Sequence, residues 1–229
     1  MIPREYLPVP TEVRRIVLWR HGRTEWNLLG RAQGHADVSL DEVGIAQARR
    51  AAPFLASYRP ALVWSSDLAR ARQTAEFLVA LTGQELVLDK RLREYDVGAR
   101  QGLTFEEFEA KLPAAYRAFR SGERGEAGEQ VPGAESADEV NSRMVAVLTD
   151  AAAALEPGET AVLVGHGAAL RSGLLTFFGL PSEFSAMLAG MANCAWAVLE
   201  QRANHGWQII DYNAQTLPEP IELADEPRG

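Results

Sequence analysis

The chain has 229 residues, of which 47% are hydrophobic and 24% charged, as in an ordinary globular protein that can bury a sizeable core. Its net charge of -8 argues against nucleic-acid binding, since nucleic-acid-binding proteins are more often basic. No apolar run reaches membrane-spanning length, and residues 1–6 lack the layout of a signal peptide. Because Cys194 is the single cysteine, no intramolecular disulfide can form. We therefore expect a cytoplasmic protein with neither nucleic-acid nor membrane partners.

Strands and helices are predicted to alternate along the chain. The apolar, β-prone runs that predict strands lie at residues 15–19, 62–65, 85–88 and 160–165. The expected helices lie at 41–57, 66–81, 136–155 and 168–178, with Asp41, Ser66 or Asp67, and Ser136 as N-caps. Residues 195–201 and 207–212 can pair as a closing hairpin. This alternation predicts an α/β fold with a mainly parallel central sheet covered on both faces.

The chain reads as one domain with an insertion. Residues 98–135 are rich in glycine and proline and hold only short helical pieces, so we interpret them as a lid over the edge of the sheet. The core spans about residues 15–212. Residues 1–14 and 217–229 are expected to form terminal arms.

The run Arg20-His21-Gly22 follows the first predicted strand directly. Open α/β sheets bind their ligands at the edge where parallel strands end. An arginine fork matches phosphate oxygens, and an unprotonated imidazole nitrogen can act as a nucleophile. Glycine lets the backbone approach an anion, and Asn27 can donate an amide N–H to the same anion. A surface pair after an edge strand is the alternative interpretation of this run.

Three further segments place chemical groups just after a predicted strand. They contain Arg70, in the first turn of a helix, Glu94, and His166 followed by Gly167. In a parallel sheet these segments share one edge with His21. The two arginines and a protonated His166 would offset the charge of a transferring phosphoryl group, which His21 would accept. Glu94 would protonate the departing alkoxide and later activate water.

These residues resemble the motifs of the histidine phosphatase superfamily, also called the phosphoglycerate-mutase-like family. The matching elements are Arg20-His21-Gly22 with Thr24 and Asn27, Ser65-Ser66-Asp67 leading to Arg70, Leu92-Arg93-Glu94, Pro132-Gly133-Ala134-Glu135-Ser136, and Gly165-His166-Gly167. The resemblance implies a three-layer α/β/α sandwich. It also implies that His21 is phosphorylated, that Glu94 is the proton donor, and that His166 and both arginines bind phosphate, with Asn27 as an auxiliary ligand.

Within the superfamily, the segment after Glu94 is closer to the phosphatases than to the mutases. Residues 92–104 and 190–214 resemble the glucosyl-3-phosphoglycerate phosphatases of actinobacteria. The resemblance therefore implies a metal-independent phosphomonoesterase for a small phosphorylated glycerate or sugar-type metabolite. A cofactor-dependent phosphoglycerate mutase and a broad-specificity acid-type phosphatase remain the alternatives. The lid arginines that could bind a substrate carboxylate, rather than simply being solvated, are Arg117, Arg120 and Arg124.

Other residues carry weaker expectations. Gln33 and Gly34, with His35, are candidates for the rim of the substrate pocket, although an ordinary loop fits them equally well. The four histidines lie far apart and offer no close ligand pair, so we expect no metal and no cofactor. The apolar segment 190–196 is a candidate dimer face by resemblance only, which leaves a homodimer as an option.

Overall fold

The computed structural model describes residues 12–121, 131–181, 184, 187–202 and 205–216. Its six strands form one sheet in the order β3-β2-β4-β1-β5-β6. The strands are β1 (Arg14–Arg20), β2 (Leu62–Ser65), β3 (Leu86–Leu88), β4 (Thr160–Gly165), β5 (Trp196–Arg202) and β6 (Gly206–Ala214). Strands β1 to β4 are mutually parallel, whereas β5 and β6 form an antiparallel hairpin beside β1. The mainly parallel sheet and its closing hairpin are therefore confirmed.

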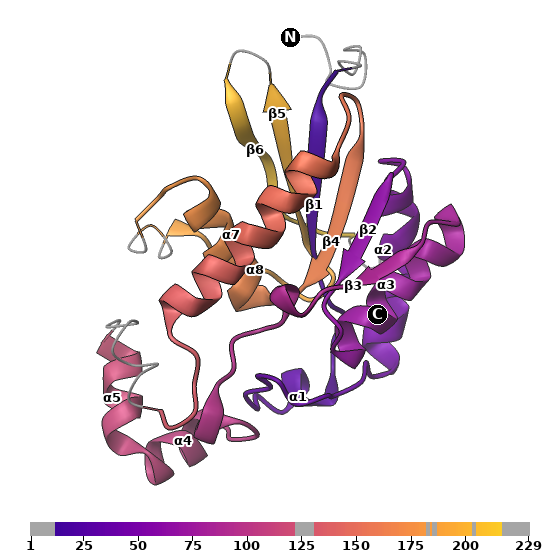
Figure 1. Ribbon diagram of the computed structural model, residues 1–229. Helices are drawn as coiled ribbons and strands as arrows, with labels where there is room; N and C mark the ends of the chain where they lie inside the picture. Colours follow the sequence, from indigo (N-terminus) through magenta and orange to yellow (C-terminus); the bar gives the residue numbers. More distant parts are fainter. Residues whose placement is uncertain (1–11, 122–130, 182–183, 185–186, 203–204, 217–229) are drawn as a thin grey trace, which may run out of the picture.

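Helices cover both faces of this sheet (Figure 1). The α-helices are α1 (Glu25–Leu28), α2 (Glu42–Ala56), α3 (Ala69–Thr82), α4 (Phe105–Lys111), α5 (Pro113–Ser121), α7 (Ala137–Ala154) and α8 (Gly167–Phe177); the 3-10 turns are η2 (Lys90–Leu92) and η3 (Gly98–Arg100). Helices α7 and α8 lie on one face of the sheet, and α2 and α3 lie on the other. The predicted α/β fold is confirmed as three layers.

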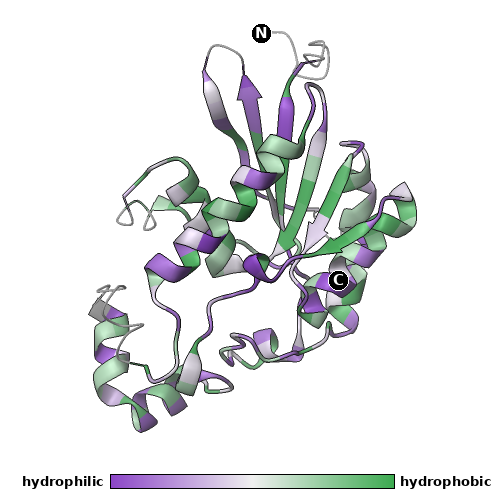
Figure 2. Cartoon of the chain, viewed as in Figure 1, coloured by the Kyte–Doolittle hydropathy of each residue, from purple (hydrophilic) through white to green (hydrophobic). Residues whose placement is uncertain are grey.

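The alternation of apolar side chains along β1 explains why a hydrophobic core lies on each face of the sheet. Successive side chains of a strand point to opposite faces. Ile16 and Leu18 accordingly join the core that contains Met144 of α7, whereas Val17 and Trp19 join the core on the α2 side. Figure 2 shows the middle of β4 as apolar, and all residues of this strand are buried, as expected for a parallel strand covered on both faces. The edge where β1 and β4 end is thus built on strands whose middle residues are buried.

Two local predictions are corrected by the structure. Neither Ser66 nor Asp67 caps α3, which begins at Ala69 after an N-cap residue that makes no side-chain bond. The carboxylate of Asp37 instead accepts the Ala69 N–H at 2.6 Å, so the cap comes from a distant loop. Glu94 does not follow a strand directly, because η2 stands between it and β3. The predicted caps Asp41 of α2 and Ser136 of α7 are confirmed.

The insertion at residues 98–135, predicted to form a lid, has a small core of its own, in which Phe108, Ala115 and Val131 pack together. Its two ends meet where Val97 and Ala134 form an antiparallel bridge. The Ala99 N–H also donates to the Pro132 carbonyl at 2.9 Å. Helices α4 and α5 of this insertion lie away from the sheet (Figure 1). Among the helices of the described ranges, none is both long and apolar enough to cross a bilayer.

Candidate active site

The site begins where β1 and β4 end side by side. The register pairs Arg20 with Gly165, so His21 and His166 leave the sheet next to each other. Their ring centroids are 5.1 Å apart with an interplanar angle of 56°. The two residues are 3% and 0% exposed, which places both imidazoles inside the protein rather than on its surface.

His21 is held in one tautomer. Its Nδ1 lies 2.6 Å from the Gly22 carbonyl oxygen, and because a carbonyl can only accept, Nδ1 carries the proton. Burial, followed by the charges of Arg70 and Arg20, holds the His21 pKa well below its usual value of 6.5. The ring is therefore neutral at neutral pH, and its Nε2 carries an unprotonated lone pair. This is the form that a nucleophilic histidine requires.

His166 is held in the opposite tautomer. Arg70 donates from Nε to His166 Nδ1 at 3.1 Å, so Nε2 carries the proton and donates to the Ser66 hydroxyl at 2.9 Å. Burial and the nearby arginine charges hold the His166 pKa well below 6.5. His166 is thus neutral here, in contrast to the protonated ring expected from the sequence, because the guanidinium of Arg70 needs its lone pair.

Arg70 is fixed by α3 and by three acceptors. Besides its bond to His166, its Nη1 and Nη2 donate to the carbonyls of Ala36 and Gly34 at 2.7 and 2.8 Å. Burial lowers its pKa to about 10, which still leaves it charged at neutral pH. Gly34 thus contributes to the site through its carbonyl, as a support for Arg70.

Arg20 has a donor free for a ligand. Its Nη1 donates to the Met191 carbonyl, but Nε is buried and has no partner in the described part of the chain. A Cβ on Gly167 would lie 3.1 Å from this Nε, so a residue without a side chain keeps the approach open. The amide oxygen of Gln33 is also buried without a partner. Buried polar groups of this kind need a partner, which fits a ligand with acceptor and donor atoms.

Glu94 lies against the N-terminus of α8. Its Oε1 accepts the N–H groups of Tyr95 and Ala169 at 3.0 and 2.9 Å, and its Oε2 accepts that of Ala168 at 3.1 Å. The charge of Glu94 raises the pKa values of Arg20 and Arg70 and so opposes the effect of their burial. The carboxyl group therefore lies within electrostatic reach of both guanidinium groups.

Asn27 is oriented by its neighbours. Its Oδ1 accepts from the backbone and hydroxyl of Thr24 at 3.1 Å and from Asn193 Nδ2 at 3.2 Å, which leaves its own Nδ2 as the group for an anion. Asn193 also donates to the His21 carbonyl at 3.2 Å. Neither Asn193 nor Ser66 was among the predicted site residues. The position of Ser66 directly after β2 was the available signal for it.

Some sequence candidates lie elsewhere. Arg117 and Arg120 are exposed on α5, and Arg124 is outside the described residues. The proposed dimer face is not available as an apolar surface, because Met191, Cys194 and Ala195 are buried within this chain. Over the described ranges, no group of three His, Cys, Asp or Glu side chains is arranged to hold a metal ion.

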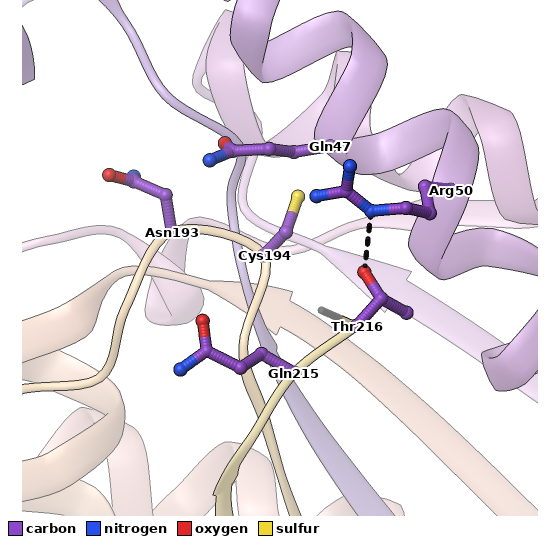
Figure 3. Close-up of a pocket in the computed structure, with 6 residues that line it drawn as sticks. All are labelled: Gln47, Arg50, Asn193, Cys194, Gln215 and Thr216. Atoms are coloured by element: carbon purple, nitrogen blue, oxygen red, sulfur yellow. Dashed lines mark hydrogen bonds between the residues drawn. The ribbon is translucent and has the colours of Figure 1, made fainter. Parts of the chain in front are cut away.

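A cavity of about 160 Å³ lies between α2 and the segments on either side of the closing hairpin (Figure 3). Its lining residues are Gln47, Arg50, Asn193, Cys194, Gln215 and Thr216. Gln47 accepts the Arg23 N–H at 2.9 Å, so this lining supports the loop that carries His21. Burial raises the pKa of the Cys194 thiol to about 12, which makes it a structural rather than a reactive group.

The comparisons with known proteins agree with this geometry. Residues 16–215 match the family model described as the histidine phosphatase superfamily, branch 1. A glucosyl-3-phosphoglycerate phosphatase of Mycolicibacterium vanbaalenii is 39% identical over 194 residues, which cover 82% of this chain and 84% of that protein. A metal-independent phosphoserine phosphatase of Arabidopsis thaliana is 40% identical over 172 residues, covering 73% and 70% of the two chains.

Solved structures of related proteins have a similar fold. A mycobacterial glucosyl-3-phosphoglycerate phosphatase in complex with VO3 superposes with a TM-score of 0.78 at 35% identity, covering 88% of this chain and all of that one. The predicted class of enzyme, a phosphoric monoester hydrolase, is confirmed by the family and by the phosphatases among its relatives. The chain belongs to branch 1 of the histidine phosphatase superfamily.

Proposed function

We propose that this protein is a metal-independent phosphatase that works through a phosphohistidine at His21. The observation that carries the proposal is the tautomer of His21, whose Nδ1 proton is held by the Gly22 carbonyl beside two guanidinium groups. A neutral, buried imidazole with a free Nε2 supplies the nucleophile. Arg20 and Arg70 supply the positive charge that stabilises a transferring phosphoryl group.

The reaction has two steps. His21 Nε2 attacks phosphorus as the P–O ester bond breaks, and the leaving alkoxide takes a proton from the Glu94 carboxyl group. Water then attacks the phosphohistidine while the Glu94 carboxylate accepts one of its protons. The P–N bond breaks, which releases inorganic phosphate and returns His21 to its starting form.

The substrate we propose is a phosphorylated glycerate or sugar-type metabolite such as glucosyl-3-phosphoglycerate. Relatives at 37–39% identity carry the name of that phosphatase, and their similarity extends over 82–88% of this chain. We further propose that the enzyme acts in the cytoplasm, which suits a chain with one buried cysteine. A homodimer stays a prediction, and the apolar side chains of Met191, Cys194 and Trp196 in the 190–196 segment are buried within this chain.

The test is phosphate release in the presence of EDTA from a panel of monoesters. The panel contains glucosyl-3-phosphoglycerate, mannosyl-3-phosphoglycerate, phosphoserine, 3-phosphoglycerate and p-nitrophenyl phosphate, with His21→Ala as the control. We expect release that EDTA does not reduce, a preference for the glycosylated glycerate, and loss of activity in the variant. Isomerisation of 3-phosphoglycerate without phosphate release would instead identify a mutase, and full activity of His21→Ala would refute the mechanism.

A further inference from the structure

Arg143 of α7 holds the backbone of the segment that carries Glu94. Its Nη1 donates to the carbonyls of Arg91 and Arg93 at 2.8 and 2.6 Å, and its Nη2 donates to the Glu94 carbonyl at 2.9 Å. One planar guanidinium therefore binds three carbonyl groups within four residues. Such a fork fixes the path of the chain at the point where the catalytic carboxyl group branches from it.

Glu135 fixes this guanidinium in turn. Its two carboxylate oxygens accept from Arg143 Nε and Nη2 at 3.0 and 2.9 Å, which is the bidentate geometry of a strong ion pair. Glu135 Oε2 also accepts the Asp96 N–H at 2.8 Å. The side chains are 16% and 22% exposed, so water screens the pair only in part.

His35 is a second side chain that contacts the same carbonyl oxygen. Its Nε2 donates to the Glu94 carbonyl oxygen at 2.9 Å, and its Nδ1 lies 3.5 Å from the Asp96 carboxylate. Two side chains from distant parts of the chain, Arg143 and His35, thus bond the Glu94 carbonyl oxygen. None of these bonds involves the Glu94 carboxyl group itself, which is left to the N–H groups at the start of α8.

We propose that Arg143 and Glu135 are positioning residues for Glu94, acting through its backbone to aim the carboxyl group at the leaving oxygen. This proposal rests on the proposed function, since it needs Glu94 as the proton donor. An error of about 1 Å in the position of a catalytic group costs up to about 100-fold in rate. Because Lys lacks the planar fork, Arg143→Lys cannot reproduce the three carbonyl bonds and the bidentate pair together.

The test compares substrates whose leaving groups differ in their need for a proton. An alkoxide leaving from phosphoserine or 3-phosphoglycerate needs a proton, whereas p-nitrophenolate leaves readily without one. We compare kcat/KM, which reports the first chemical step, for an alkyl and an aryl phosphate. We expect Glu94→Gln, Arg143→Lys and Glu135→Gln to lose activity selectively on the alkyl substrate. For the latter two variants that loss should be about 10- to 100-fold, with p-nitrophenyl phosphate changed by less than about threefold.

Arg15→Lys is the matched control. Arg15 and Glu200 form an ion pair of similar exposure, 13% and 12%, at the opposite end of β1. We expect this variant to leave the ratio of alkyl to aryl activity unchanged. The double variant Glu94→Gln/Arg143→Lys should lose no more alkyl activity than Glu94→Gln alone, since both changes remove the same proton transfer.

The outcomes separate the two proposals. If Arg143→Lys and Glu135→Gln lower both activities equally, or if the double variant is additive, the positioning role is overturned while the phosphatase mechanism stands. If Glu94→Gln itself shows no dependence on the leaving group, Glu94 is not the proton donor and the mechanism fails at its first step. Aryl activity retained in each variant also shows that the site is folded.

Discussion

Two histidines of one site are set to different protonation patterns by their hydrogen-bond partners. A carbonyl holds the proton of His21 on Nδ1, whereas a guanidinium keeps Nδ1 of His166 free of a proton. The sequence marks both residues, because each directly follows an apolar strand. It cannot reveal the tautomer of His166, because the partner Arg70 is 96 positions away. The roles of these residues remain proposals that depend on such contacts.

Glu94 gives a prediction at the scale of one residue. Glu94→Gln keeps the shape of the side chain but can neither donate the proton nor accept one from water. With p-nitrophenyl phosphate we expect fast phosphorylation of His21 followed by slow hydrolysis. Stopped-flow absorbance should then record a burst of about one p-nitrophenol per chain, the signature of a covalent intermediate.

The covalent intermediate can be identified directly. Phosphate carried on an imidazole is stable in alkali and labile in acid, so mild quenching at high pH should preserve it in Glu94→Gln. The His21→Ala/Glu94→Gln double variant should show neither burst nor bound phosphate. A burst that persists without His21 would place the nucleophile elsewhere.

At the scale of elements, the loop carrying His21 packs against the start of α2. A Cβ on Gly22 would lie 2.5 Å from the Gly44 carbonyl oxygen, and Gly22 also donates its N–H to Thr74 at 3.0 Å. Gly22→Ala must push the loop away from the helix. We expect it to lower the free energy of unfolding by about 1–3 kcal/mol, a typical cost of overpacking, and to reduce phosphatase activity.

Gly190→Ala is the comparison for this substitution. A Cβ there meets no atom within 4 Å in the structure, so we expect little change in either property. Urea unfolding followed by circular dichroism measures the first property, and hydrolysis of p-nitrophenyl phosphate measures the second. Equal stability of the two variants would mean that the contact between the loop and α2 is not as close as described.

Elements with a local signal were predicted well. The strand at 62–65 and the capping box at Ser136 depend on neighbouring residues, and both occur as expected. The start of α3 was misplaced because its cap, Asp37, comes from another part of the chain. Helix α1 was not predicted, because a helix of four residues is too short to show a repeating pattern of apolar residues.

For the whole molecule, the buried histidines predict a pH dependence of stability. The folded state holds the pKa values of His21 and His166 well below 6.5, whereas in the unfolded chain both titrate near that value. Below about pH 6.5 the unfolded state therefore binds more protons than the folded state. Stability is fully present above this pH and falls as the pH drops, by about 1.4 kcal/mol per pH unit for each histidine.

This contribution can be isolated from that of the carboxylates. Arginine partners lower the pKa values of carboxylates such as Glu135 and Asp67, so their protonation in acid also destabilises the protein. That loss occurs equally in the wild-type protein and in the histidine variant. Denaturant unfolding between pH 7 and 5 should give a steeper decline for the wild-type protein than for His21→Gln/His166→Gln. Parallel declines would show that these rings take up protons in the folded state.

The arrangement of the sheet explains which parts of the site could be predicted. Residues that leave strand ends, such as Arg20, His21 and His166, were found because parallel strands bring their ends to one edge. Asn193 and Arg143 reach the site from a loop and from a helix that carry no motif of their own. Their contribution arises from packing between distant segments and becomes visible only in the fold.

The bridge between Val97 and Ala134 joins the two ends of the 98–135 insertion, directly beside the hydrogen bond from the Asp96 N–H to Glu135. Helices α4 and α5 have their own small core above this bridge. A second attachment joins this insertion to the rest of the chain, because Ala32 pairs with Gly102 and Leu103 through backbone hydrogen bonds of 2.8 and 3.0 Å. We expect that exchange of α4 and α5 between relatives changes which alcohol portion of the substrate is accepted and leaves the phosphate chemistry at His21 unchanged.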